Sequence, residues 1–210
     1  MSNTEMHTPE LAEVEVDMDR GAFLVKGALA AGAIYGATAV GPFVRRAFAQ
    51  GGGTDVDILN FALTLEYLEA AFYEQGLQSA KLGGEAKSVA ETIASDEQAH
   101  VDALKMTIED LGGTPVEAPG VDFGSAINSE GPFLKLAQTF EDTGVSAYNG
   151  AGPMLKSKEL LGTAGSIVQV EARHAARIRL LNGESPSPDA FDQTLSMDEV
   201  LAAVQPFVKS

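Results

Sequence analysis

The chain has 210 residues, 45% of them hydrophobic, which is enough for one folded domain with a sizeable core and an appended segment. It contains no cysteine, which excludes disulfides, thiolate metal clusters and cysteine nucleophiles. Its formal net charge of −16 makes nucleic acid and anionic membrane surfaces poor partners.

Residues 1–49 are expected to lie outside the folded domain. A polar, acidic stretch precedes an apolar run over residues 23–44, and an Ala-Phe-Ala sequence of the kind that signal peptidase cuts ends at Ala49. This order of polar stretch, apolar run and cleavage sequence resembles a twin-arginine (Tat) export signal. However, Arg20 is followed by Gly21 where that motif has its second arginine. We therefore expect an exported protein, on the periplasmic or cell-wall side, cleaved near Ala49.

A retained membrane anchor is the alternative interpretation of the same segment. Residues 23–44 carry a single charge, Lys26, and are long enough to span a bilayer, so they could tether the protein to a membrane. In either case the glycine-rich residues 50–54 are expected to form a linker to the domain that follows.

Helical periodicity predicts four long helices within residues 55–182, at about 55–82, 85–111, 132–151 and 158–181. Residues 112–131 contain several glycines and prolines without a helical period, which indicates a long crossover loop. A short helix at about 197–208 is expected in the C-terminal extension, residues 183–210. The order predicts an all-α four-helix bundle made of two antiparallel hairpins joined by one crossover.

Both histidines of the predicted bundle lie in Glu-x-x-His motifs, Glu97 with His100 and Glu171 with His174. A spacing of three places both side chains of a motif on one helix face, where they can reach the same metal ion. Each histidine could instead be a surface residue paired with its own glutamate. The recurrence of the motif favours a metal site.

The other two long helices each carry a glutamate followed seven residues later by a tyrosine, Glu66 with Tyr73 and Glu141 with Tyr148. These two pairs are separated by 75 residues, and the two Glu-x-x-His motifs by 74. The chain therefore contains two copies of a helical hairpin, and each copy carries Glu, Tyr, Glu and His in the same order. Two such hairpins would bring four carboxylates and two imidazoles to one midpoint.

This set resembles the ligands of ferritin-like dimetal proteins, which take one glutamate from each of two helices and Glu-x-x-His from each of the other two. The sequence LNFALTLEYLE at residues 59–69, with Phe72 and Tyr73, is similar to bacterial ferritin-like proteins grouped with desiccation-related proteins. The resemblance implies an up-down-down-up ferritin-like bundle holding two metal ions. Its expected ligand roles are bridging for Glu97 and Glu171, terminal for Glu66 and Glu141, and one histidine per metal for His100 and His174.

Carboxylate and imidazole ligands suit iron or manganese, and zinc would also bind. Four buried carboxylates need compensating charge, which two divalent cations supply, so we expect two Fe or two Mn ions as the cofactor. The hydroxyls of Tyr73 and Tyr148 either need a partner in the core or donate hydrogen bonds to the ligand carboxylates. Glu69 rivals Glu66 as a ligand, but it lacks a tyrosine seven residues later.

The resemblance implies an oxidoreductase that oxidises ferrous iron or consumes O2 or peroxide in a stress response. Alternatives are an iron-storage cage subunit and a desiccation- or stress-related protein whose metals are structural and do not turn over. A homodimer is the expected assembly.

Overall fold

A computed structural model describes residues 53–209 of the chain. The predicted signal or anchor, residues 1–49 with the apolar run 23–44, lies outside the described residues, as does most of the linker. Within the described part, no helix combines the length and the apolar character needed to cross a bilayer.

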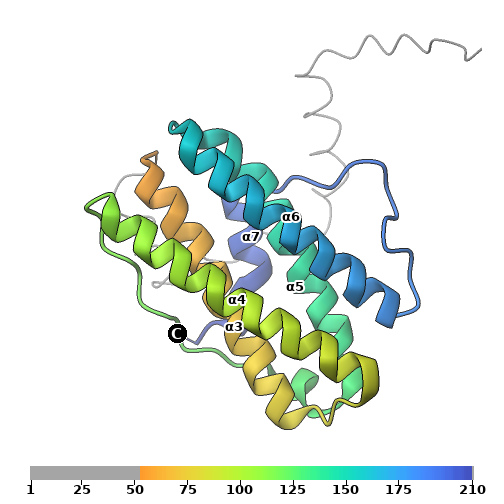
Figure 1. Ribbon diagram of the computed structural model, residues 1–210. Helices are drawn as coiled ribbons and strands as arrows, with labels where there is room; N and C mark the ends of the chain where they lie inside the picture. The colour runs from red at the N-terminus through yellow and green to blue at the C-terminus, as the bar shows by residue number, and fades with distance from the viewer. Residues whose placement is uncertain (1–52, 210) are drawn as a thin grey trace, which may run out of the picture.

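Four long helices dominate the structure (Figure 1). Helix α3 packs along α4, α5 packs along α6, and the two pairs meet through α3 with α5 and α4 with α6. Residues 53–209 contain no β-structure beyond one isolated bridge. The prediction of an all-α bundle is therefore confirmed. The four helices span Asp55–Ser79 (α3), Gly84–Asp110 (α4), Glu130–Ala151 (α5) and Lys158–Leu181 (α6).

Two helix ends differ from the sequence prediction. Helix α3 ends at Ser79, three residues early, because Lys81 adopts a positive φ of 53°, which a right-handed helix does not accommodate. Helix α5 begins at Glu130 and not after Pro132. A proline is tolerated there because the amide N–H groups of the first turn have no partner within the helix.

The crossover between α4 and α5 is held against the bundle by specific contacts. The side chain of Asn60 on α3 donates a hydrogen bond to the carbonyl of Thr114 and accepts one from the amide of Val116. A short 3₁₀ helix, η1 (Gly124–Asn128), lies near the end of the crossover. Asn60 thereby provides hydrogen-bond partners for backbone groups of a segment that has no regular secondary structure of its own.

The C-terminal extension returns across the bundle and pairs with the crossover. Helix α7 (Met197–Val204) is followed by a 3₁₀ turn, η3 (Gln205–Phe207), so the α-helix is shorter than predicted, with Pro206 in that turn. The amide of Asp122 donates to the carbonyl of Phe207. The buried residues of α7, which are Val200, Leu201 and Val204, belong to the hydrophobic core.

A cluster of aromatic rings fills one end of the bundle. Phe72 stacks on Phe133 with ring centroids 4.6 Å apart. Gly76 allows this approach, since a Cβ there would lie 2.1 Å from the Phe133 ring. The cluster fixes the α3–α5 contact next to the predicted metal ligands and also contains Tyr73, Phe123, Phe140 and Phe207.

Candidate metal centre

The structure brings all six predicted ligand side chains together in the middle of the bundle, each from the helix where the sequence places it. The four glutamates are fully buried, and His100 and His174 are 9% and 2% exposed. Their ligand atoms form two groups in which all atoms lie within 4.8 Å of one another. One group contains Glu66, Glu97, His100 and Glu171, and the other contains Glu97, Glu141, Glu171 and His174.

Glu97 and Glu171 belong to both groups, and each turns one carboxylate oxygen to each histidine. Oε2 of Glu97 lies 3.4 Å from Nδ1 of His100, and its Oε1 lies 2.9 Å from Nδ1 of His174. Oε1 of Glu171 lies 3.0 Å from Nδ1 of His100, and its Oε2 lies 4.0 Å from Nδ1 of His174. These two carboxylates therefore span the space between the two imidazoles.

Glu66 and Glu141 each approach one histidine. Oε2 of Glu66 lies 3.2 Å from Nδ1 of His100, and Oε2 of Glu141 lies 3.6 Å from Nδ1 of His174. The arrangement follows the pseudo-twofold repeat of the sequence, with one terminal carboxylate and one imidazole on each side.

The two tyrosines that lie seven residues after a glutamate each contact the opposite half of the repeat. The Tyr73 hydroxyl donates a hydrogen bond to Oε1 of Glu141, and the Tyr148 hydroxyl donates one to Oε1 of Glu66. Each tyrosine thus holds the glutamate of the other hairpin. The sequence leaves open whether these hydroxyls find another partner in the core or donate to ligand carboxylates. In the structure they donate to the candidate ligand carboxylates.

The centre fits a bound cation because most of its polar atoms face one another and have no partner outside the ligand set. Both oxygens of Glu97, both of Glu171, Oε2 of Glu141 and Nδ1 of His174 are buried without a hydrogen bond of good geometry, and their ion-pair contacts are all to other members of the cluster. Buried polar atoms in native proteins almost always have a partner, and six such atoms converging on one space are the expected donor set of a metal site.

In the metal-free protein, the charges around the candidate ligands favour the protonated forms of the histidines and carboxylates. Burial would lower the pKa of His100, but its contacts with Glu171, Glu66 and Glu97 raise that pKa to about 12. Burial would likewise lower the pKa of His174, but its contacts with Glu141 and Glu97 raise that pKa to about 11. Both imidazoles are therefore cationic at neutral pH when no metal is present.

The carboxylates respond in the opposite sense to burial. Desolvation raises the pKa of Glu97 to about 7, against the lowering effect of both histidines. Desolvation and the neighbouring charges of Glu97 and Glu66 raise the pKa of Glu171 well above its ordinary value. A divalent cation would replace these protons, because it supplies the positive charge that the carboxylates require.

Glu69 is a fifth buried carboxylate at the centre. It is 3% exposed, and burial together with the charges of Glu171 and Glu97 raises its pKa well above the ordinary value. The sequence showed Glu69 only as a rival to Glu66. Its partner in the 75-residue repeat is Gly144, and that pairing is the signal that could have identified it.

Asp96 and Asp142, the acidic neighbours of two ligands, have different partners. Oδ2 of Asp96 lies 3.0 Å from Nε2 of His174, which leaves Nδ1 of that ring facing the carboxylates. A hydrogen bond of this kind orients a metal-binding histidine. Asp142 instead forms an ion pair with Arg179, with 2.6 Å between Oδ1 and a guanidinium nitrogen.

A bundle of four long helices with paired Glu-x-x-His motifs at its midpoint defines the class of ferritin-like proteins. The chain belongs to the ferritin-like domain family, whose model matches residues 54–184. Its fold is similar to that of the ferritin-like, diiron-carboxylate proteins from Bacillus anthracis strain Ames, with a TM-score of 0.52 and 23% sequence identity. That match covers 67% of this chain and 98% of the other. No curated protein matches the chain.

Proposed function

We propose that the six converging side chains bind two redox-active metal ions. The overlap of the two ligand groups at Glu97 and Glu171 carries this proposal, because a carboxylate with one oxygen toward each half is suited to bridge two ions. The remaining ligands then divide evenly. Glu66 and His100 complete one site, and Glu141 and His174 complete the other.

Iron is the preferred occupant of the proposed centre, with manganese as the alternative. Carboxylates and imidazoles without thiolates suit both metals, and zinc would bind but has no redox chemistry. The similar Bacillus anthracis fold is described as a diiron-carboxylate protein, which supports iron. Two divalent cations also offset the charge of the four ligand carboxylates.

We propose that the protein is an oxidoreductase that oxidises ferrous iron or consumes O2 or peroxide, in a role in stress protection. Bound iron or manganese would supply one-electron redox chemistry toward these oxidants. The protein's own residues hold the carboxylates and exclude bulk water. Tyr73 and Tyr148 fix the two terminal glutamates, and Asp96 fixes the ring of His174.

Oxygen consumption by the full chain after addition of ferrous iron tests this function. The wild type is expected to consume oxygen well above the rate of ferrous iron alone. Glu171→Gln should abolish the excess, because it removes a charged oxygen from both ligand groups. Glu159→Gln, at an exposed position on the same helix, should leave the rate unchanged. A wild-type rate equal to that of iron alone, with O2 and also with peroxide as the oxidant, would contradict the proposal.

We further propose that the protein works outside the cytoplasm. The Ala-Phe-Ala sequence ending at Ala49 supports cleavage at that point. N-terminal sequencing of the protein recovered from the cell envelope should then begin at Gln50. Recovery of the intact chain from the membrane fraction would favour the anchor at residues 23–44.

A further inference from the structure

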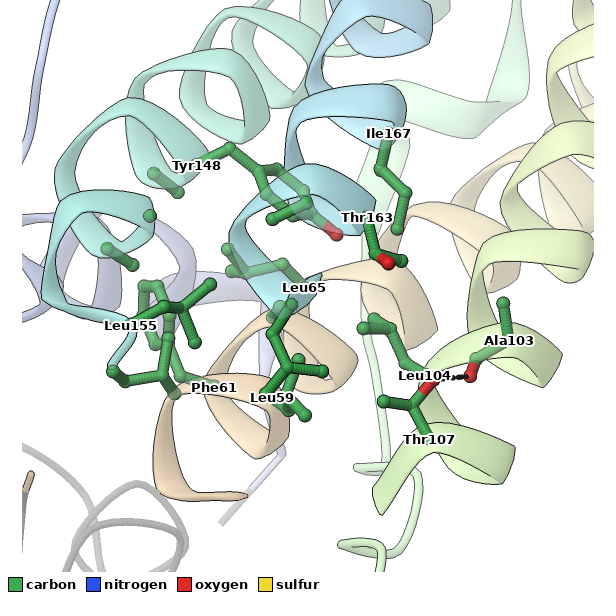
Figure 2. Close-up of a pocket in the computed structure, with 17 residues that line it drawn as sticks. Leu59, Phe61, Leu65, Ala103, Leu104, Thr107, Tyr148, Leu155, Thr163 and Ile167 are labelled. Carbon is green, nitrogen blue, oxygen red and sulfur yellow. Dashed lines mark hydrogen bonds between the residues drawn. The ribbon is translucent and has the colours of Figure 1, made fainter. Parts of the chain in front are cut away.

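A small apolar cavity lies among the four long helices (Figure 2). The centre of a water-sized sphere can move within it over about 30 Å³. One bound water needs roughly 10–15 Å³ by that measure, so the cavity has room for a molecule of two heavy atoms. Its walls are almost entirely aliphatic and aromatic and include Ala62, Leu65, Leu104, Ala147, Tyr148 and Ile167.

The cavity is one helical turn from the ligands on two facing helices. Leu104 lines it and lies four residues after His100 on α4, and Ile167 lines it and lies four residues before Glu171 on α6. Four residues of α-helix rise by about 6 Å. The near wall of the cavity, at Leu104 and Ile167, is therefore about one helical turn from the ligand side chains.

Tyr148 joins the cavity to the centre directly. Its ring lines the cavity, while its hydroxyl donates a hydrogen bond to Glu66. Ala62, on the preceding turn of α3, lines the cavity below Glu66 and has a small side chain. None of the six candidate ligands lines the cavity itself, so Tyr148 is the residue that connects the cavity to Glu66.

The cavity reaches the surface between α4 and α6. Among its lining residues, Ala103 on α4 and Thr163 on α6 are exposed, and Thr107 and Ala164 are half-buried. Figure 2 shows Thr107 and Thr163 on the two helices that flank this opening. Both hydroxyls donate to carbonyls of their own helices, Thr107 to Ala103 at 2.7 Å and Thr163 to Glu159 at 3.3 Å.

The hydrogen bonds of the lining hydroxyls make the cavity unfavourable for a polar molecule. The three hydroxyls on the lining, those of Thr107, Tyr148 and Thr163, already donate their protons elsewhere. Hydrogen peroxide could donate to these hydroxyl oxygens, but its own oxygens would find no hydroxyl proton to accept, at a cost of about 1–3 kcal/mol per unpaired group. Dioxygen makes no strong hydrogen bonds with water and is not subject to this cost.

We propose that the cavity between α4 and α6 binds dioxygen and delivers it to the centre, which makes O2, and not peroxide, the oxidant taken up by this route. The inference rests on the proposed function for the oxidant's use, but the binding of an apolar gas does not depend on it.

Crystals of the full chain pressurised with xenon test the binding site without any turnover. Xenon density is expected among Leu65, Leu104 and Ile167, because a dry apolar cavity binds such gases. Ala62→Leu should remove the density by filling the space. Absence of xenon from the wild-type cavity would overturn the proposal.

Steady-state oxidation of ferrous iron tests delivery. The double variant Thr107→Leu/Thr163→Leu, which crowds the opening, should raise the KM for oxygen several-fold and leave the KM for peroxide unchanged. Thr92→Leu is the matched control, since Thr92 is exposed on α4 and its hydroxyl also donates to the carbonyl four residues earlier.

The two proposals fail differently in this pair of experiments. Oxygen consumption that the double variant leaves unchanged, or an equal rise in both KM values, would overturn delivery through the cavity alone. A wild type that binds xenon but consumes no oxygen would contradict the proposed function and with it the assignment of the oxidant.

Discussion

The carboxylate of Glu69 occupies the space that a side chain on Gly144 would need: its Oε1 lies 3.1 Å from the ideal Cβ position of Gly144. The two residues correspond in the 75-residue repeat, so one hairpin supplies a fifth buried carboxylate and the other supplies the room for it. The pseudo-twofold symmetry of the ligands is broken at this point, and Oε2 of Glu171 lies 3.5 Å from the same Cβ position.

Gly144→Ala should therefore stabilise the protein less than a comparable substitution elsewhere. Alanine gains about 1 kcal/mol over glycine within a helix, but here its methyl must displace Glu69 toward the other carboxylates. Gly162→Ala on α6 is the control, because nothing lies within 4 Å of its ideal Cβ. Urea unfolding measures both free energies of unfolding, and equal gains would contradict the close packing of Glu69 on Gly144.

Glu69→Gln should stabilise the metal-free protein at pH 8 by about 1 kcal/mol or more. Burial and four neighbouring carboxylates disfavour a charge at this position, and glutamine is neutral with nearly the same shape. Glu74→Gln, at an exposed position on the same helix, should change little. The measurement is denaturant unfolding in the presence of a chelator, and a loss of stability in Glu69→Gln would show that the carboxylate is paired.

Tyr73→Phe should weaken metal binding by roughly tenfold, the low end of the range for groups that hold metal ligands. The variant leaves Oε1 of Glu141 without its hydrogen bond and frees that carboxylate to reorient. Tyr67→Phe, a half-buried tyrosine on the same helix, is the control. Competition with a chelator of known affinity gives the two dissociation constants. Equal constants in the two variants would mean that the crossed hydrogen bond does not position the ligand.

The metal-free protein should lose stability as the pH rises from about 5 to 8. The pKa values of Glu97, at about 7, and of Glu171 and Glu69 are raised in the folded state, so folding binds protons over this range and the stability is lost as the pH passes the folded pKa values. The raised pKa values of the two histidines, about 12 and 11, act in the same direction above the unfolded value near 6.5.

Metal binding should reverse that dependence, because the ions displace protons from the ligands and bind more tightly as the pH rises. Denaturant unfolding with and without metal across the pH range separates the two trends. Stability of the metal-free protein that increases between pH 5 and 8 would contradict the proton-loaded centre.

The bundle and its six converging side chains could be predicted because they follow from periodic spacing. A separation of three residues fixes the relation between Glu97 and His100 on one helix, and the repeat fixes their relation to Glu171 and His174. The helices themselves required only apolar periodicity and the glycines that end it.

Features that depend on packing between helices could not be read in this way. The spacing places Tyr73 on the same helix face as Glu66 but does not give the partner of its hydroxyl, which is Glu141 across the bundle. Spacing within one helix gives the height of a side chain but not its partner on another helix. The burial of Glu69 likewise depends on the missing side chain of Gly144, which acts only after α3 and α5 have packed.

The metal content of the full chain, purified without oxygen, is the decisive measurement for the proposed dimetal centre. We expect about two iron or manganese ions per chain, and their loss in a His100→Ala/His174→Ala variant that keeps its helical circular dichroism. A wild type that binds no metal, or a variant that keeps both ions, would contradict a dimetal centre at these six residues.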